Sequence, residues 1–127
     1  MAIPNDYREI VNLLVDKTKE GQVNWRSDRF NIYVFFEGAR FIMWAGNDEN
    51  TDEPFVAFGL GDKSGATLDS WFVDEREVPD YSTMFELYKS AKRYAAGVPD
   101  KLKKLREGLA SSNAIGFSDT NDEDPLF

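Results

Sequence analysis

The feature that most restricts the fold of this chain is a long run in which apolar side chains alternate with other side chains at a period of two. The run begins near Trp25 and ends near Val73. Period two is typical of β-strands, because successive side chains of a strand point to opposite faces of its sheet. Stretches rich in glycine and acidic residues divide the run, and such stretches are typical of turns. The pattern predicts four strands joined as an antiparallel meander, with the sequences RFNIYVFF (29–36), RFIMWA (40–45), PFVAFGL (54–60) and ATLDSWFV (66–73).

Segments with a helical period flank these strands. Before them, apolar residues recur at helical spacing from Tyr7 to Leu14, and Gly21 follows as a helix terminator. After them, a second apolar stripe runs over residues 84–95 and is followed by Gly97 as a helix terminator, and a shorter stripe runs over 102–109. We therefore expect one helix before the strands and two after them.

These elements predict a two-layer α+β domain over residues 1–109, with an N-terminal helix, a four-stranded antiparallel meander and two C-terminal helices. Helices from both ends of the chain can cover the same face of the sheet. Residues 110–127 are small, polar and acidic, and we expect them to form a flexible acidic tail. A chain of 127 residues is long enough for one such core and too short for two.

The chain contains no cysteine and no histidine. This excludes disulfides, thiolate nucleophiles, thiolate zinc sites and a histidine general base. No spacing of the carboxylates singles out a catalytic pair, so we expect a protein that is not an enzyme and that holds no cofactor or metal. The stretch GLGDKSG (59–65) lies between two predicted strands, and it predicts a hairpin turn rather than a phosphate loop.

Sequence features that direct a chain to a membrane are not found. No apolar run approaches the roughly 20 residues that a membrane-spanning helix needs. The first ten residues, MAIPNDYREI, lack the basic flank and the apolar segment of a signal peptide. We expect a cytoplasmic protein that does not bind a membrane.

Charge is distributed unevenly along the chain. The net charge is -8, and the stretches 46–54 and 110–127 each hold four acids and no base. Residues 89–106, by contrast, hold seven bases and a single acid. Because proteins bind phosphate groups through cations, this basic stretch is a candidate contact for nucleic acid on a protein that is acidic as a whole.

One face of the predicted sheet carries many aromatic side chains. Phe30, Ile32 and the alternate residues after them point to one side of the sheet. If that side faces the helices, the aromatic and basic side chains between them point to the other face. Rings of this kind stack on the bases of single-stranded nucleic acid, while Arg and Lys hold the phosphates. A homodimer interface, or coverage by a terminal segment, is the alternative explanation. The candidate nucleic-acid contacts are Arg29, Tyr33, Phe35, Arg40, Trp44 and Trp71 on the sheet, with Lys89, Lys92 and Arg93 in the basic stretch.

The chain ends in the acidic sequence DEDPLF. Apolar side chains at such a position gain nothing until another surface buries them, so the ending is a candidate binding segment, and a purely solubilising tail is the alternative. The ending resembles the acidic, phenylalanine-ended tip of bacterial single-stranded-DNA-binding proteins and of some phage replication proteins. Leu126 is a departure, since proline and phenylalanine are adjacent in the bacterial tip. The residues that match are Asp122, Glu123, Asp124, Pro125 and Phe127.

This resemblance implies that Phe127, with Pro125 and the acids before it, binds basic, apolar pockets on replication or repair proteins. We expect Leu126 to be part of the same binding segment. In layout, four strands followed by a helix are similar to the PUR-repeat and Whirly type of single-strand binder. We therefore expect a homodimeric accessory protein of replication or recombination that binds single-stranded DNA. We also expect the acidic tail to compete for the basic stretch until single-stranded DNA displaces it. The alternatives are a small acidic protein-interaction or DNA-mimic protein without nucleic-acid binding, and an acidic chaperone for a secreted substrate.

Overall fold

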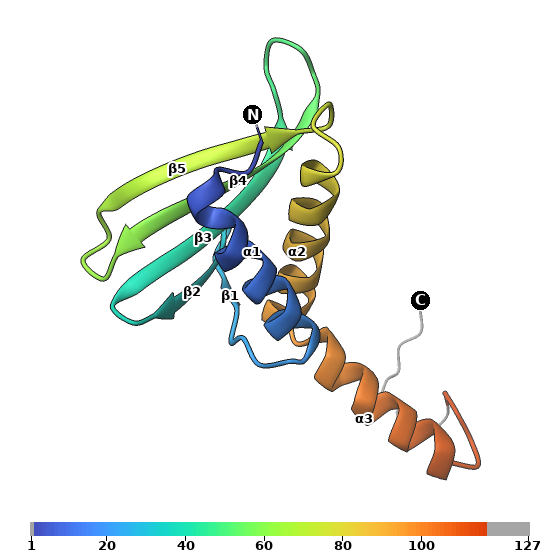
Figure 1. The fold of residues 1–127 in the computed structure, drawn as a ribbon. Helices are drawn as coiled ribbons and strands as arrows, with labels where there is room; N and C mark the ends of the chain where they lie inside the picture. The colour runs from blue at the N-terminus through green and yellow to red at the C-terminus, as the bar shows by residue number, and fades with distance from the viewer. Residues whose placement is uncertain (1, 117–127) are drawn as a thin grey trace. The chain divides into compact units, whose positions relative to one another are not determined.

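The computed structural model describes residues 2–116 of the chain. Within them, an N-terminal helix, an antiparallel sheet and two further helices follow one another, which confirms the α+β class (Figure 1). The elements are α1 (Asn5–Lys19), β1 (Arg26–Ser27), β2 (Ile32–Phe36), β3 (Ala39–Asn47), β4 (Pro54–Asp62), β5 (Thr67–Asp74), α2 (Asp80–Ala95) and α3 (Val98–Ser111).

The sheet has five strands in the order β1-β2-β3-β4-β5, and each strand is antiparallel to its neighbours. The predicted meander is confirmed, but the predicted count of four strands was wrong, because residues 26–27 pair with β2 as a short additional strand. Asp28 causes the break between them, since its Oδ1 accepts hydrogen bonds from the backbone N–H groups of Phe30 and Asn31. Phe30 therefore lies in a turn and is 74% exposed, whereas the sequence pattern placed it against the helices.

Helices α1 and α2 lie against the same face of the sheet, and the core forms between the two layers (Figure 1). Val11 of α1 and Leu87 of α2 are buried together with Met43, Val56 and Phe58 of the strands. Burying an apolar side chain of this size contributes about 1.5 to 3 kcal/mol. The two helices cover only one face, so the opposite face of the sheet has neither of them as a cover.

Polar contacts fasten α1 to the rest of this layer. Asp80, at the start of α2, accepts hydrogen bonds from the backbone N–H of Ile3 at 3.0 Å and from the guanidinium of Arg8 at 2.8 and 3.0 Å. At the other end of α1, the indole N–H of Trp25 donates to the hydroxyl of Thr18 at 2.9 Å, and both residues are buried. These contacts fix the helix at both of its ends.

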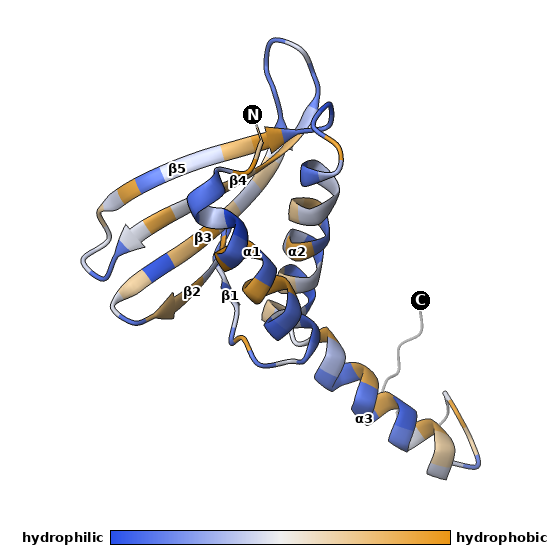
Figure 2. Cartoon of the chain, in the orientation of Figure 1, coloured by the Kyte–Doolittle hydropathy of each residue, from blue (hydrophilic) through white to orange (hydrophobic). Residues whose placement is uncertain are grey.

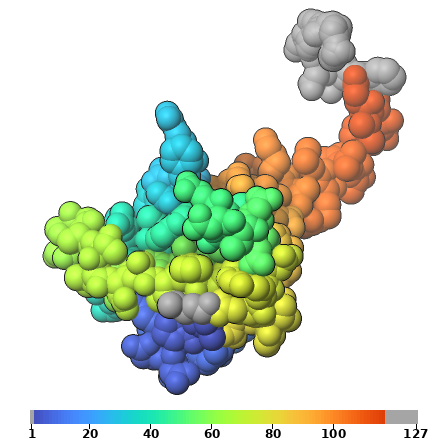
Figure 3. Space-filling view, turned by 90° about the horizontal axis from the view of Figure 1, so that it is seen from above, coloured from blue at the N-terminus to red at the C-terminus, as the bar shows by residue number. Residues whose placement is uncertain are grey.

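The acidic connection between β3 and β4 is anchored at one end of the sheet. Arg76, which follows β5, forms ion pairs of 2.9 Å with Glu53 and with Asp74. The backbone N–H of Glu75 also donates to the carbonyl of Pro54. Figure 3 shows these two connections side by side, in green and in yellow. The charge of Arg76 is therefore neutralised by its own acidic neighbours.

The chain divides into two compact units, one up to Ala96 and one from Gly97 onward. Gly97 has a φ of +74°, a left-handed conformation that glycine adopts without strain, and it separates α2 from α3 as the sequence predicts. Helix α3 has no buried residue. Its apolar and polar residues alternate along the helix (Figure 2), and Leu102, Leu105 and Leu109 are exposed. The predicted domain boundary at residue 109 stays a prediction.

Candidate nucleic-acid interface

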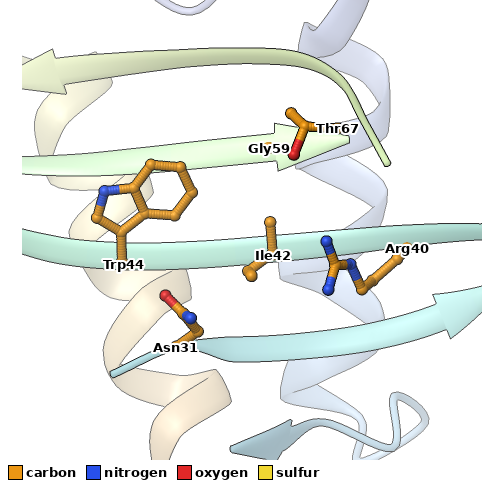
Figure 4. A pocket seen from close by; sticks show the side chains of 6 residues that line it. All are labelled: Asn31, Arg40, Ile42, Trp44, Gly59 and Thr67. Carbon is orange, nitrogen blue, oxygen red and sulfur yellow. The ribbon is translucent and has the colours of Figure 1, made fainter. Parts of the chain in front are cut away.

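The face of the sheet opposite α1 and α2 collects four of the predicted nucleic-acid contacts, and we call it the aromatic face. Tyr33 and Phe35 lie on β2, and Arg40 and Trp44 lie on β3. The strand register sets Arg40 directly beside Phe35. Figure 4 shows this face in front, with both helices behind the sheet. Along β2 and β3, the side chains that the sequence pattern assigns to the core, such as Ile32, Val34 and Met43, are buried, and those between them point outward, as predicted.

Two pairs of rings flank the residues of β3 on the aromatic face. Tyr33 and Phe35 meet edge to face, with ring centroids 5.8 Å apart. Phe55 of β4 and Phe72 of β5 meet in the same way at 5.9 Å. The sequence prediction missed this second pair, although period two along β4 and β5 was a signal for it. The aromatic face consequently carries rings on four consecutive strands.

Trp71 does not lie on the aromatic face, and its predicted placement there was wrong. It is 6% exposed, stacks on Phe58 with centroids 5.2 Å apart, and meets the ring of Tyr7 edge-on at 5.4 Å. Adjacent Trp71 and Phe72 are both large and apolar, so alternation alone does not say which of them points inward. Asp69 lies two positions before Trp71 and points to the same side of the sheet. Its carboxylate accepts a hydrogen bond of 3.0 Å from the hydroxyl of Tyr7 on α1.

The predicted basic contacts are divided among different parts of the structure. Arg29 lies in the exposed turn before β2. Lys89, Lys92 and Arg93 lie on α2, which packs against the opposite face of the sheet, and Lys89 pairs with Glu86 at 3.2 Å. The other bases of that stretch lie on α3, in the second unit. The structure therefore does not place the bases of α2 beside the rings of the aromatic face; Lys89 and Lys92 instead lie over rings of α2 itself.

A hollow of about 240 Å³ lies in the middle of the aromatic face (Figure 4). Gly59 of β4 forms its floor, because a Cβ there would lie 2.9 Å from Cγ2 of Ile42 and 3.5 Å from Cζ3 of Trp44. The next outward position of β4 is Gly61, and a Cβ there would lie 3.3 Å from Nη2 of Arg40. Two glycines thus let the side chains of β3 lie across β4. The hollow is lined by Asn31, Arg40, Ile42, Trp44, Gly59 and Thr67.

Arg40 is half-buried, yet it forms no hydrogen bond or ion pair with any residue of the described range 2–116. Its Nε is buried without a partner. Hydrogen bonds from the backbone N–H groups of Phe30 and Asn31 hold the pKa of Asp28 below its usual range, and the charge of Arg40 makes a smaller contribution. A guanidinium stays charged at every accessible pH and offers five donors. Arg40 is therefore the side chain on this face that is best suited to bind an anion.

A second, larger hollow is an apolar groove of about 710 Å³ between α1 and the strands β2 and β3. Leu13 of α1 and Phe36 of β2 line it, and each is more than half exposed. Lys17 is the charged residue of the lining. Such an exposed apolar surface indicates a contact with another protein segment.

Known proteins do not identify either surface: no family model matches the chain, and neither the curated proteins nor the solved structures contain a significant match. Within residues 2–116, no group of three or more acidic side chains is arranged to hold a metal ion, and no helix is long and apolar enough to cross a membrane. The predicted partner-binding tail, Asp122 to Phe127, lies outside the described residues.

Proposed function

We propose that the aromatic face binds single-stranded nucleic acid in the cytoplasm. The observation that carries this proposal concerns Arg40, a half-buried arginine that forms no ion pair within residues 2–116. It lies among rings on a sheet face that neither α1 nor α2 covers. Bases stack on aromatic rings, and a guanidinium binds phosphate oxygens. Each stacked base contributes about 1 to 3 kcal/mol, so three or four contacts in the upper half of that range, about 2 to 3 kcal/mol each, suffice for micromolar affinity.

The geometry favours single strands over duplexes. The rings of Tyr33, Phe35 and Trp44 can stack only on bases that are free of a duplex stack. The face offers few cations, and the protein as a whole is acidic, with a net charge of -8. We therefore expect affinity that comes mainly from stacking, with a modest dependence on salt.

Fluorescence anisotropy of a labelled single-stranded oligonucleotide tests this proposal. We expect Phe35→Ala and Trp44→Ala each to weaken binding about 5- to 150-fold, the equivalent of one lost stacking contact. Leu13→Ala is the matched control, because Leu13 is a similarly exposed apolar residue on α1. A duplex of the same sequence is expected to bind much more weakly than the single strand.

A second control distinguishes the aromatic face from the basic residues of α2. Lys89→Ala together with Lys92→Ala is expected to change the affinity less than twofold, because α2 packs against the other face of the sheet. Loss of binding in this variant, with full binding by Phe35→Ala and Trp44→Ala, would move the site to α2. No binding by the unaltered protein would refute the proposal as a whole.

The tail supplies a second part of the proposal, which rests on the sequence. Leu126, Phe127 and the acids before them would bind a replication or repair protein through a basic, apolar pocket. An immobilised peptide of residues 117–127 tests this against purified proteins of that class. We expect retention by the peptide and loss of retention after Phe127→Ala, while equal retention by both peptides would show nonspecific attraction to the acids.

The apolar groove supports a second candidate function, which is self-association. The leucines of α3 form an uncovered apolar stripe at helical spacing, and this helix carries four bases and two acids, whereas the chain up to Ala96 has a net negative charge. An amphipathic helix can place such a stripe in an apolar groove, and its net positive charge is attracted by the net negative charge of the first unit. The occupant that we propose for the groove is therefore α3 of a second copy of the chain.

Light scattering after size-exclusion chromatography tests this second candidate. We expect a dimer, and we expect Leu105→Ser in α3 and Leu13→Ser in the groove each to produce monomers, since either change removes one side of the same contact. A monomeric unaltered protein, or a dimer that survives both substitutions, would contradict it.

A further inference from the structure

The hollow on the aromatic face can recognise its ligand more specifically than the rest of the face can. We infer that it is a subsite for a single nucleotide, which places its base on the indole of Trp44 and its phosphate at the guanidinium of Arg40. This inference rests on the proposed function and names the group that the centre of the face recognises.

The two glycines of β4 define the shape of this subsite. At Gly59, even a methyl group would come within 2.9 Å of Ile42, a separation that real Cβ atoms do not show. Strands disfavour glycine because it has no side chain to pack and loses more backbone entropy. Here the side chains of Ile42 and Trp44 come close to the backbone at Gly59, and Gly61 lies at an irregularity of the strand pairing between Leu60 and Gly61. At about 240 Å³, the hollow is smaller than the pockets of roughly 300 to 1,000 Å³ that enclose drug-sized ligands, so it leaves no room for more than one nucleotide.

The lining combines the groups that a nucleotide needs. Trp44 and Ile42 present an apolar surface for a base, as Figure 4 shows, and Arg40 lies two positions further along the same face of β3 from Ile42. Asn31 and Thr67 stand at the two sides of the hollow with an amide and a hydroxyl. These side chains can hydrogen-bond to base edges or to a sugar. The side chain of Asn31 already hydrogen-bonds to Asp28, so Thr67 is the better placed of the two.

A simple anion does not account for this combination of side chains. Phosphate or sulfate would contact Arg40 but would gain nothing from the indole beside it. A neutral aromatic compound would stack on Trp44 but would leave the buried Nε and the other donors of Arg40 unsatisfied, which is costly at a half-buried site. A ligand with both a planar ring and an anionic group uses both side chains, and a nucleotide is the ligand of that chemistry that a single-strand-binding face presents.

Tryptophan fluorescence provides a direct readout of this subsite. The chain has three tryptophans, and Trp25 and Trp71 are buried, so a nucleotide in solution reaches Trp44. We expect a nucleoside monophosphate to quench the emission with an affinity on the order of 1 mM, as the combination of one stack and one charged contact predicts. Inorganic phosphate and the uncharged nucleoside are the comparison probes, and each is expected to bind at least tenfold more weakly. In Trp44→Phe, the quenching by the nucleotide should disappear.

Two substitutions alter the subsite, and one serves as a matched control. Arg40→Gln removes the charge and is expected to weaken nucleotide binding tenfold or more, the typical effect of losing a charged hydrogen bond. Gly59→Ala fills the floor and is expected to abolish the quenching. Gly46→Ala adds the same methyl group to the same face outside the hollow, where its nearest neighbour is the tip of the Phe55 ring at 3.4 Å, and it should bind as the unaltered protein does.

The outcomes separate this inference from the function on which it rests. If the labelled oligonucleotide binds with normal affinity to Arg40→Gln and to Gly59→Ala, and mononucleotides do not quench Trp44, the face binds single strands without this subsite and the inference is wrong. If neither oligonucleotide nor mononucleotide binds, the proposed function falls with it. Quenching by inorganic phosphate as strong as that by the nucleotide would reduce the subsite to a simple anion site and would overturn the inference. Gly59→Ala changes the packing of the sheet and could prevent folding. In that case Arg40→Gln, which leaves the packing of Gly59 unchanged, still tests the inference.

Discussion

Gly59→Ala has a predictable effect on stability as well as on binding. The new Cβ would lie 2.9 Å from Cγ2 of Ile42, a close contact between a methyl group and a branched side chain on the adjacent strand. Overpacking of this kind costs about 1 to 3 kcal/mol. The lower backbone entropy of unfolded alanine offsets about 0.5 to 1 kcal/mol of that cost. We therefore expect the free energy of unfolding to fall by about 1 kcal/mol, within a range of about 0 to 2.5 kcal/mol.

Urea denaturation of a double-mutant cycle measures this effect. With a slope of about 2 kcal/mol per molar urea, Gly59→Ala should lower the midpoint by about 0.5 M without changing the slope. Ile42→Ala removes the group that clashes. The double variant should therefore be more stable than the sum of the two single effects predicts, by about 1 kcal/mol.

The same double-mutant cycle can also refute this argument. If Gly59→Ala is as stable as the unaltered protein and the two substitutions are additive, Ile42 has other positions available and Gly59 does not shape the floor of the hollow. The size argument for a single-nucleotide subsite would then be lost. Gly46→Ala, with 3.4 Å to a ring tip, should show no such coupling with Ile42→Ala.

Three further predictions concern the core contacts and the charge of the aromatic face. Thr18→Val should lower the free energy of unfolding by about 1 to 3 kcal/mol in thermal or urea denaturation, because it leaves the buried indole N–H of Trp25 without an acceptor, whereas Thr18→Ser should retain most of the stability. Burial and the hydrogen bond to Asp69 raise the pKa of Tyr7 to about 12, above its ordinary value of 10, so its contribution is complete below pH 10 and is lost between pH 10 and 12. The stability difference between the unaltered protein and Tyr7→Phe should therefore vanish over that interval, and a difference independent of pH would contradict this assignment. For binding, Arg40→Gln should reduce the slope of log affinity against log salt by about 0.7, the value for one phosphate contact with a single strand, and an unchanged slope would show that Arg40 does not contact phosphate.

The elements with long, regular periods could be predicted from the sequence. The helical stripe of residues 7–14, the terminators Gly21 and Gly97, and the alternation along β2 and β3 all correspond to observed elements. These features are local, because each depends on spacing within one segment. The placement of Tyr33 and Trp44 on the aromatic face follows from that alternation.

The errors arose where local spacing does not decide the structure. The additional strand β1 has two residues, too few for any period, and it exists because the side chain of Asp28 closes a turn behind it. Trp71 and Phe72 are adjacent and equally apolar, and contacts of Trp71 with distant Phe58 decide which one is buried. The separation of Lys89 from the rings of the aromatic face also depends on tertiary packing, since it is determined by which face of the sheet α2 covers.

The candidate site was predictable in its aromatic residues but not in its shape. Alternation predicts that Trp44 and Arg40 share a face, yet it says nothing of the hollow between them. That hollow depends on Gly59 and Gly61, which lie on a neighbouring strand, and on a register that only strand pairing determines. The sequence interpretation ended the third strand at residue 60 and assigned Gly61 to the hairpin turn, whereas both glycines lie within β4 and the turn follows them.

The strand order has a consequence for the way this chain reaches its native state. Every sheet pairing joins strands that are consecutive along the chain, so the sheet can grow one hairpin at a time with short loops to close. The link between Ile3 and Asp80, by contrast, spans 77 residues. We expect the β3–β4 hairpin to be largely formed in the folding transition state and the docking of α1 to follow it. Substitutions at Arg8 should then accelerate unfolding and leave the folding rate nearly unchanged.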